Sequence, residues 1–315
     1  MARAKGPNPG APGFAVRGSR FEVRGSEFPT AGRTMVKESP VNALTTSLSR
    51  YAESLESLYQ RSNRRELTAR DPVRFLYAYD DTADREVVGL IASCLAYGRV
   101  AQILGSVGKV LDVLGPRPAE FLRHTPEVHW RRALAGFKHR FQTGADVSAM
   151  LSGVQRILRR DGSLRTSFLK GWKQDDSTVL PALARFVGEI VAAAGGHCGH
   201  LLPDVASGSA CKRLHLYLRW MVRSDAVDVG DWSQVPPSAL LVPLDTHMHR
   251  IGQALGATRR RQADLRTAME LTRAFAQVVP DDPVRYDFAL ARLGILGGGG
   301  LEGFLRDCGA KVADA

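Results

Sequence analysis

The sequence predicts an all-α fold. After residue 42, apolar residues recur at helical spacing along most of the chain, and glycine and proline separate these segments. No stretch shows the convincing alternation of apolar and polar residues that is typical of β-strands. With 315 residues, of which 44% are hydrophobic, the chain can bury a sizeable core. We expect a helical domain over residues 43–315, with its N- and C-terminal helices against a central segment, 84–256.

Residues 1–42 differ from the rest in being rich in Gly, Pro, Ser and Arg. Their phenylalanines are too scattered to build a core, so we interpret this segment as a disordered basic tail. It is either a solvated extension or an arm that adds nonspecific affinity for DNA. Its seven basic and three acidic residues account for only part of the net charge of +11. The folded part is therefore basic as well, which favours nucleic acid as a partner.

The first helices are predicted in order from the apolar spacing. One covers residues 43–63, and Asp71 with Pro72 then opens a short helix, with the aspartate as its N-cap. Residues 84–114 form two helices that are joined near Tyr97 and Arg99. These two side chains either touch DNA at the turn, or are a packed tyrosine and an exposed arginine.

A basic stretch over residues 123–140 follows the loop 115–118. Its segment FKHRF places Lys138, His139 and Arg140 between two phenylalanines, as in surfaces that face nucleic acid. The alternative is a solvated basic face. Residues 147–160 and 178–194 are then predicted to be helical.

Lys212 follows the small-residue segment 207–210 and opens a largely apolar helix. The positive end of the helix dipole, the neighbouring Arg213 and partial burial all disfavour a charged amine at this position. An uncharged amine is a nucleophile, as in enzymes that form Schiff bases. The alternative is a surface lysine or one that binds phosphate.

Asp245 follows the apolar run 239–244 and precedes a helix that ends at Gly256, so it is predicted to be the N-cap of that helix. A carboxylate there accepts backbone hydrogen bonds at the positive end of the helix dipole and stays ionised near neutral pH. It can face a developing cation, or it can serve as a structural cap alone. Beyond it we expect a helix over residues 264–278 and a last, buried helix.

The spacing of histidines and cysteines gives no metal or disulfide site. His247 and His249 lie two positions apart, and on a helix such side chains point about 200° apart, so they cannot share one ion. The four cysteines are far apart and form no CxxC pair, so we interpret them as reduced thiols. No run of residues is long and apolar enough for a membrane helix, and no signal peptide is evident.

The segment PLDTHMHRIGQALG, residues 243–256, resembles the V-D-T-H-V-x-R-V-x-x-R-L-G signature of the helix-hairpin-helix/Gly-Pro-Asp DNA glycosylases. Asp245 takes the position of their catalytic aspartate, and Lys212 is the matching candidate for the lysine of the lyase-type members. The usual L-P-G-V-G-x-K-T-A hairpin is absent, although Gly208 and Lys212 keep its Gly-x-x-x-Lys spacing. The 32 residues between Lys212 and Asp245 resemble the separation in archaeal 8-oxoguanine DNA glycosylases. The wider string from Lys212 to His247 also resembles a family of bacterial proteins assigned to that superfamily.

The resemblance implies a bundle of two helical halves with a cleft between them, and a DNA repair enzyme that excises a damaged base. Lys212 would form a Schiff base and Asp245 would assist it, with AP lyase activity as a result. The alternative is a non-catalytic nucleic-acid-binding module on the same fold. The expected DNA contacts are Gly208, Ser209, Arg213, His247, Arg250, Tyr97, Arg99, Lys138, His139 and Arg140.

The implied partner is double-stranded DNA that carries a damaged base. Only Cys308 lies beyond Asp245, whereas the iron–sulfur loop of some glycosylases needs four cysteines, so we expect no iron–sulfur cluster and no other cofactor. We further expect a monomer that is cytoplasmic and associated with the nucleoid.

Overall fold

A computed structural model describes residues 48–295 and 300–309, and it confirms the predicted all-α class. These residues cluster into one compact unit. The disordered-tail prediction for residues 1–42 lies outside the described residues. The α-helices and strands are α1 (Ala52–Ser62), α2 (Thr82–Cys94), α3 (Val100–Leu114), α4 (Pro118–His124), α5 (Glu127–Ala133), β1 (Lys138–His139), β2 (Gln142–Thr143), α6 (Gly144–Asp161), α7 (Leu164–Leu169), α8 (Leu180–Ala193), α9 (Lys212–Val222), α10 (Thr246–Ala254), α11 (Leu265–Ala276), α12 (Asp287–Ile295) and α13 (Gly300–Asp307).

Short 3-10 helices connect several of these elements. They are η1 (Leu48–Tyr51), η2 (Arg65–Arg70), η3 (Pro72–Ala78), η4 (Val205–Ser207) and η5 (Pro237–Ala239). Asp71 caps η3 as predicted, because its Oδ1 accepts a hydrogen bond of 2.9 Å from the amide of Val73. The predicted pair of helices over 84–114 is also confirmed, with the break between α2 and α3 at residues 95–99.

One feature of the chain departs from the helical expectation. Strands β1 and β2 pair antiparallel, with Lys138 opposite Thr143 and His139 opposite Gln142. A strand of two residues is too short to show an alternating pattern in the sequence, so this hairpin was not predicted. The basic stretch over residues 123–140 therefore contains the end of α4, all of α5 and β1.

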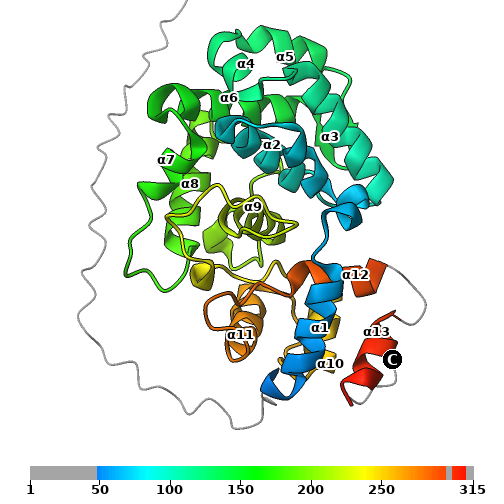
Figure 1. Cartoon of the computed structure of the whole chain (residues 1–315). Helices are drawn as coiled ribbons and strands as arrows, with labels where there is room; N and C mark the ends of the chain where they lie inside the picture. The colour runs from blue at the N-terminus through cyan, green and yellow to red at the C-terminus, as the bar shows by residue number, and fades with distance from the viewer. Residues whose placement is uncertain (1–47, 296–299, 310–315) are drawn as a thin grey trace, which may run out of the picture. The chain divides into compact units, whose positions relative to one another are not determined.

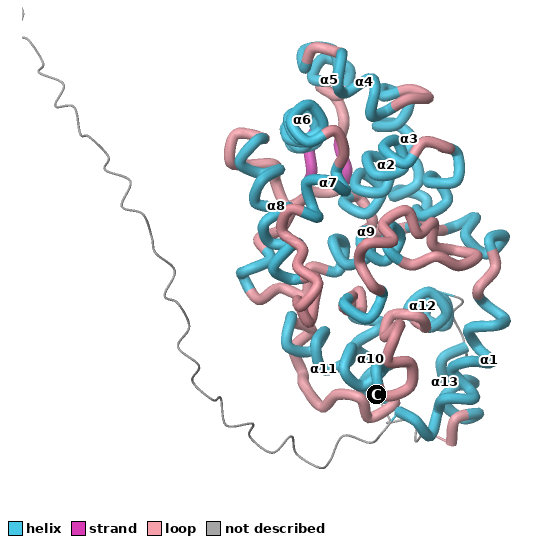
Figure 2. Tube along the Cα trace, turned by 60° about the vertical axis from the view of Figure 1, so that its left-hand side comes forward, coloured by secondary structure: helices cyan, strands magenta, loops and turns pink. Residues whose placement is uncertain are grey.

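Helix α9 lies in the middle of the described unit, as Figures 1 and 2 show from two directions. Helices α2 to α8 lie on one side of it, and α1 and α10 to α13 lie on the other. α2 packs against α9, α6 against α8, and α10 against α12. The N-terminus of α9 therefore lies where it can meet residues from both groups.

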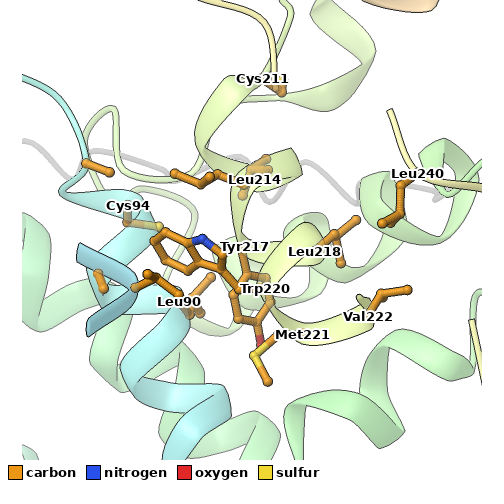
Figure 3. Packing of buried hydrophobic residues seen from close by; sticks show 14 of the residues in the cluster. Leu90, Cys94, Cys211, Leu214, Tyr217, Leu218, Trp220, Met221, Val222 and Leu240 are labelled. Atoms are coloured by element: carbon orange, nitrogen blue, oxygen red, sulfur yellow. The ribbon is translucent and has the colours of Figure 1, made fainter. Parts of the chain in front are cut away.

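The central position of α9 follows from its sequence, which is apolar on nearly all sides. Leu214, Tyr217 and Trp220 are fully buried and pack with Leu90 and Cys94 of α2 (Figure 3). Trp232 is also fully buried. Both tryptophans thus belong to the core.

Two buried ion pairs connect α9 to the rest of the unit. The guanidinium of Arg219, whose side chain is 3% exposed, lies 3.0 Å from Asp228 Oδ1 and also contacts the carboxylate of Asp287 at the start of α12. Buried charges are stable only when they are paired, so this arginine fixes the relative positions of α9 and α12.

Gly153 allows α6 and α8 to approach closely, because a Cβ at this position would lie 2.4 Å from the carbonyl oxygen of Ile190. Gly188, also inside a helix, has no atom within 4 Å of such a Cβ. We expect Gly153→Ala to lower the free energy of unfolding by about 1–3 kcal/mol through overpacking. Gly188→Ala should raise it by up to about 1 kcal/mol, because alanine favours helix. Urea unfolding measures the stability of both variants. Equal changes in the free energy of unfolding would contradict the close approach of α6 to α8 at Gly153.

Among the residues described here, no helix is long and apolar enough to cross a membrane.

Candidate active site

Lys212 and Asp245 meet at the N-termini of α9 and α10. The Nζ atom of Lys212 lies 2.8 Å from Oδ2 of Asp245, and the two side chains are 35% and 29% exposed. The pair is thus in direct contact although 33 positions separate the residues in sequence. Both functional groups remain partly accessible, which a site that acts on a bound molecule requires.

Asp245 is the N-cap of α10, as predicted. Its Oδ1 accepts a hydrogen bond of 2.9 Å from the backbone amide of Met248, while its other oxygen contacts Lys212. Burial raises the pKa of Asp245, but the charge and hydrogen bond of Lys212, the Met248 amide and the nearby His247 lower it more strongly. The net pKa lies below the ordinary value of 3.8, so the carboxylate is ionised at neutral pH.

Lys212 is the first residue of α9 and follows an unusual backbone conformation. Cys211, the residue before it, has φ 42° and ψ 38°, in the left-handed region that side chains other than glycine rarely adopt. The preceding loop is anchored to the start of α11, because the Leu265 amide donates to the Gly208 carbonyl at 2.9 Å and Ser209 bridges to Asp264. Strained backbone of this kind persists only where its surroundings hold it, and it is frequent at functional sites.

Two further carboxyl groups lie within electrostatic range of the Lys212 amine. They belong to Asp71, the N-cap of η3, and to Asp287, the partner of Arg219. Burial raises the pKa of Asp71, and hydrogen bonding to Val73 and the charges of Arg219 and Lys212 oppose this shift. Asp71 was predicted only as a helix cap, and Asp287 was not predicted as a site residue. The signal in the sequence that could have identified Asp287 is its charge next to the apolar residues of α12.

Arg213, one of the expected DNA contacts, turns towards the protein. Its guanidinium donates to the carbonyls of Cys94 and His200, and its Cζ lies 5.0 Å from the centre of the Tyr97 ring. The Tyr97 hydroxyl donates in turn to the carbonyl of His139 at 3.2 Å. Arg213 therefore connects the start of α9 to the turn before α3 and to the β1–β2 hairpin.

His139 does not fit the expected basic surface, because it is fully buried. Its Nδ1 lies 2.9 Å from the Ser106 hydroxyl and its Nε2 lies 3.1 Å from the Tyr97 carbonyl. Burial lowers the pKa of His139, although backbone hydrogen bonds oppose the shift. Both ring nitrogens are thus engaged within the protein, and a DNA contact by this imidazole requires the hairpin to open.

The remaining candidates for DNA contact are exposed on the described surface: Gly208, Ser209, His247, Arg250, Arg99, Lys138 and Arg140. His247 is exposed whereas His249 is buried, with its Nε2 2.9 Å from the Arg260 carbonyl. The two histidines therefore point in different directions, as their helical spacing predicts. Within the described ranges, no group of three or more His, Cys, Asp or Glu side chains is arranged to hold a metal ion.

All four cysteines have free thiols; Cys94, Cys198 and Cys211 are buried and Cys308 is half-buried. Burial raises the pKa of Cys211, next to Lys212, so this thiol is protonated and not poised as a nucleophile. Lys212 thus remains the candidate nucleophile at this position.

Comparison with known proteins gives one match. Residues 71–296 match the model of a family described as "Protein of unknown function (DUF2400)". No curated protein and no solved structure matches the chain. The matched residues include Asp71, Lys212, Asp245 and Asp287, and they cover well over half of the sequence. The chain therefore belongs to the DUF2400 family.

Proposed function

We propose that the protein is a DNA glycosylase with AP lyase activity, in which Lys212 is the nucleophile and Asp245 assists it. The observation that carries this proposal is the distance of 2.8 Å between Lys212 Nζ and Asp245 Oδ2. A general base lies within about 2.6–3.2 Å of the atom that carries the proton it accepts. The carboxylate of Asp245 meets this requirement and is ionised at neutral pH.

The proposed reaction begins with proton transfer from the Lys212 ammonium to the Asp245 carboxylate. The nitrogen lone pair then forms a bond to C1′ of the damaged nucleotide, and the base departs with the electrons of the C1′–N bond and takes up a proton. A negative charge beside the sugar stabilises the positive charge that develops on it. The base has to leave the helical stack before this attack, because its C1′ is otherwise shielded.

The second stage is elimination. The sugar ring opens to an imine between C1′ and Lys212, and loss of a C2′ proton expels the 3′ phosphate by cleavage of the C3′–O bond. Water then hydrolyses the imine and restores the lysine. No step needs an oxidant, a reductant or a bound cofactor.

Two sequence observations support a nucleic acid as the substrate. The segment 243–256 resembles the signature of helix-hairpin-helix/Gly-Pro-Asp DNA glycosylases, with Asp245 at the position of the catalytic aspartate. The chain also carries a formal net charge of +11, which favours a polyanionic partner.

A second candidate, a nucleic-acid-binding module without chemistry, is favoured by the same contact in a different role. Asp245 caps α10 and is neutralised by Lys212, so the pair is also a complete structural link between α9 and α10. In that case both residues hold the fold, and no base is released.

Base release separates the two candidates. The full-length protein is incubated with duplexes that each carry one 8-oxoguanine, uracil or alkylated purine, and free base is measured by chromatography. We expect release from at least one of these duplexes and none from an undamaged control. Binding to duplex DNA without release from any lesion would favour the binding module.

A further inference from the structure

The tip of the β1–β2 hairpin presents an aromatic ring to solvent. Phe141, which follows Arg140 between the two strands, is 77% exposed. Among the residues that the structure describes, the only other exposed large hydrophobic side chain is Val128, at 63%. An exposed phenylalanine leaves apolar surface in water, and contact with another molecule would bury that surface.

The hairpin that carries the Phe141 ring is held in place by its own backbone and by buried contacts. Arg140 has φ 52°, a left-handed conformation that turns the chain between the strands. Beneath the tip lies the buried His139, bonded to Ser106 and to the Tyr97 carbonyl. The hairpin then leads directly into α6, and Thr143 and Asp146 form a capping box at the N-terminus of this helix. Phe141 therefore projects from an ordered base that keeps it away from the core.

Three exposed cations lie on the hairpin and on the turn beside it. Arg99, Lys138 and Arg140 are all exposed, and none of the three forms an ion pair within the part of the chain that the structure describes. The guanidinium carbon of Arg140 lies 5.5 Å from the centre of the Phe141 ring. A Cβ on Gly98 would lie 3.0 Å from Arg140 Cδ, so the turn that carries Arg99 lies beside the hairpin. An aromatic ring among unpaired cations matches a nucleic acid strand, with bases to stack on and phosphates to neutralise.

The hairpin is connected to the candidate active site through two contacts. Arg213, next to Lys212, lies over the Tyr97 ring, and the Tyr97 hydroxyl donates to the carbonyl of His139 in β1. The rings of Tyr97 and His139 also meet edge to face, with centroids 4.7 Å apart. Arg213 and Tyr97 therefore fix the position of the hairpin relative to the start of α9, where Lys212 lies.

We propose that Phe141 stacks on an unpaired base of the bound DNA, while Lys138 and Arg140 hold the adjacent phosphates. Phe141 is then a positioning residue: it stabilises DNA whose stacking is already interrupted at the nucleotide on which Lys212 acts. This inference rests on the proposed function for its substrate, but the stacking itself requires no chemistry. A nucleic acid strand fits better than a protein partner, because it supplies both bases for the ring and phosphates for the three cations.

The test uses the fluorescence of 2-aminopurine, which changes when this base analogue stacks on an aromatic ring. The analogue is placed opposite an abasic site in a duplex, and the full-length protein is titrated into it. We expect wild type to change the fluorescence, Phe141→Ala to abolish the change and weaken binding by on the order of ten-fold, and Phe141→Trp to retain both. Val128→Ala removes the other exposed hydrophobic side chain and should behave as wild type.

Base release by the same variants separates this inference from the proposed function. A fluorescence change that requires an aromatic residue at position 141 supports the stacking role, even if no variant releases a base from any lesion. An unchanged signal and unchanged affinity in Phe141→Ala would overturn the stacking role, even if base release is normal. Failure of wild type to bind any duplex at low salt would overturn both.

Discussion

Replacement of Asp245 by asparagine should slow base release by about 10²–10³-fold, because loss of a charge that is aimed at the reacting centre has effects of this size. The amide oxygen of asparagine still caps α10 through the Met248 amide, so the fold should persist. The carboxylate that pairs with Lys212 is lost, however, and with it the proton acceptor and the negative charge beside the sugar. Single-turnover kinetics on the lesion that wild type processes measures the change.

Asp264 offers a matched control for this substitution. It also caps a helix, α11, because its Oδ1 accepts a hydrogen bond of 2.9 Å from the Thr267 amide. It also forms an ion pair with a basic residue, Arg260, at 2.7 Å. Asp264→Asn should therefore leave base release close to wild type. Equal losses in the two variants would show that the effect of Asp245→Asn comes from helix capping and not from chemistry.

Replacement of Arg219 by methionine should lower the free energy of unfolding by about 3–5 kcal/mol, because it leaves buried carboxylates without their partner. Asp228 is fully buried and Asp287 nearly so, and Arg219 bonds to both. Arg223 still contacts Asp228, so the loss falls mainly on Asp287 and on the junction of α9 with α12. Urea unfolding followed by circular dichroism measures the change in stability.

The control for Arg219 is an arginine whose ion pair is exposed. Arg117 lies 2.7 Å from Glu120, and the two side chains are 73% and 50% exposed. Arg117→Met should change stability by less than about 1 kcal/mol, because solvent screens such pairs. Similar small effects in both variants would contradict a stabilising role for the buried network.

Local rules were sufficient to predict the supports of the candidate site. An aspartate before an apolar helical pattern indicates an N-cap, and both Asp71 and Asp245 accept the expected backbone hydrogen bonds. The apolar run after Lys212 likewise predicted the buried helix α9 that this lysine begins. These features depend on residues that are close in sequence.

Features that depend on distant contacts were not predictable in the same way. His139 is buried because Ser106 and Tyr97, more than 30 positions away, bond to its ring. Asp287 lies near Lys212 only because α12 packs beside α10 and Arg219 holds it. The sequence offered a weaker signal for such residues, namely a charge within an apolar run, since a buried charge requires a partner.

Borohydride trapping tests the central claim, that Lys212 attacks DNA beside Asp245, most directly. An imine between lysine and the opened sugar is reduced by borohydride to a stable amine, which joins protein and DNA on a denaturing gel. We expect wild type to give this adduct with a lesion or abasic duplex, and Lys212→Ala to give none while still binding DNA. The control is Lys170→Ala, which removes another lysine that is paired with an aspartate, Asp161, at 2.6 Å. This variant should form the adduct as wild type does. An adduct that persists in Lys212→Ala, or the absence of any adduct with wild type, would contradict the assignment.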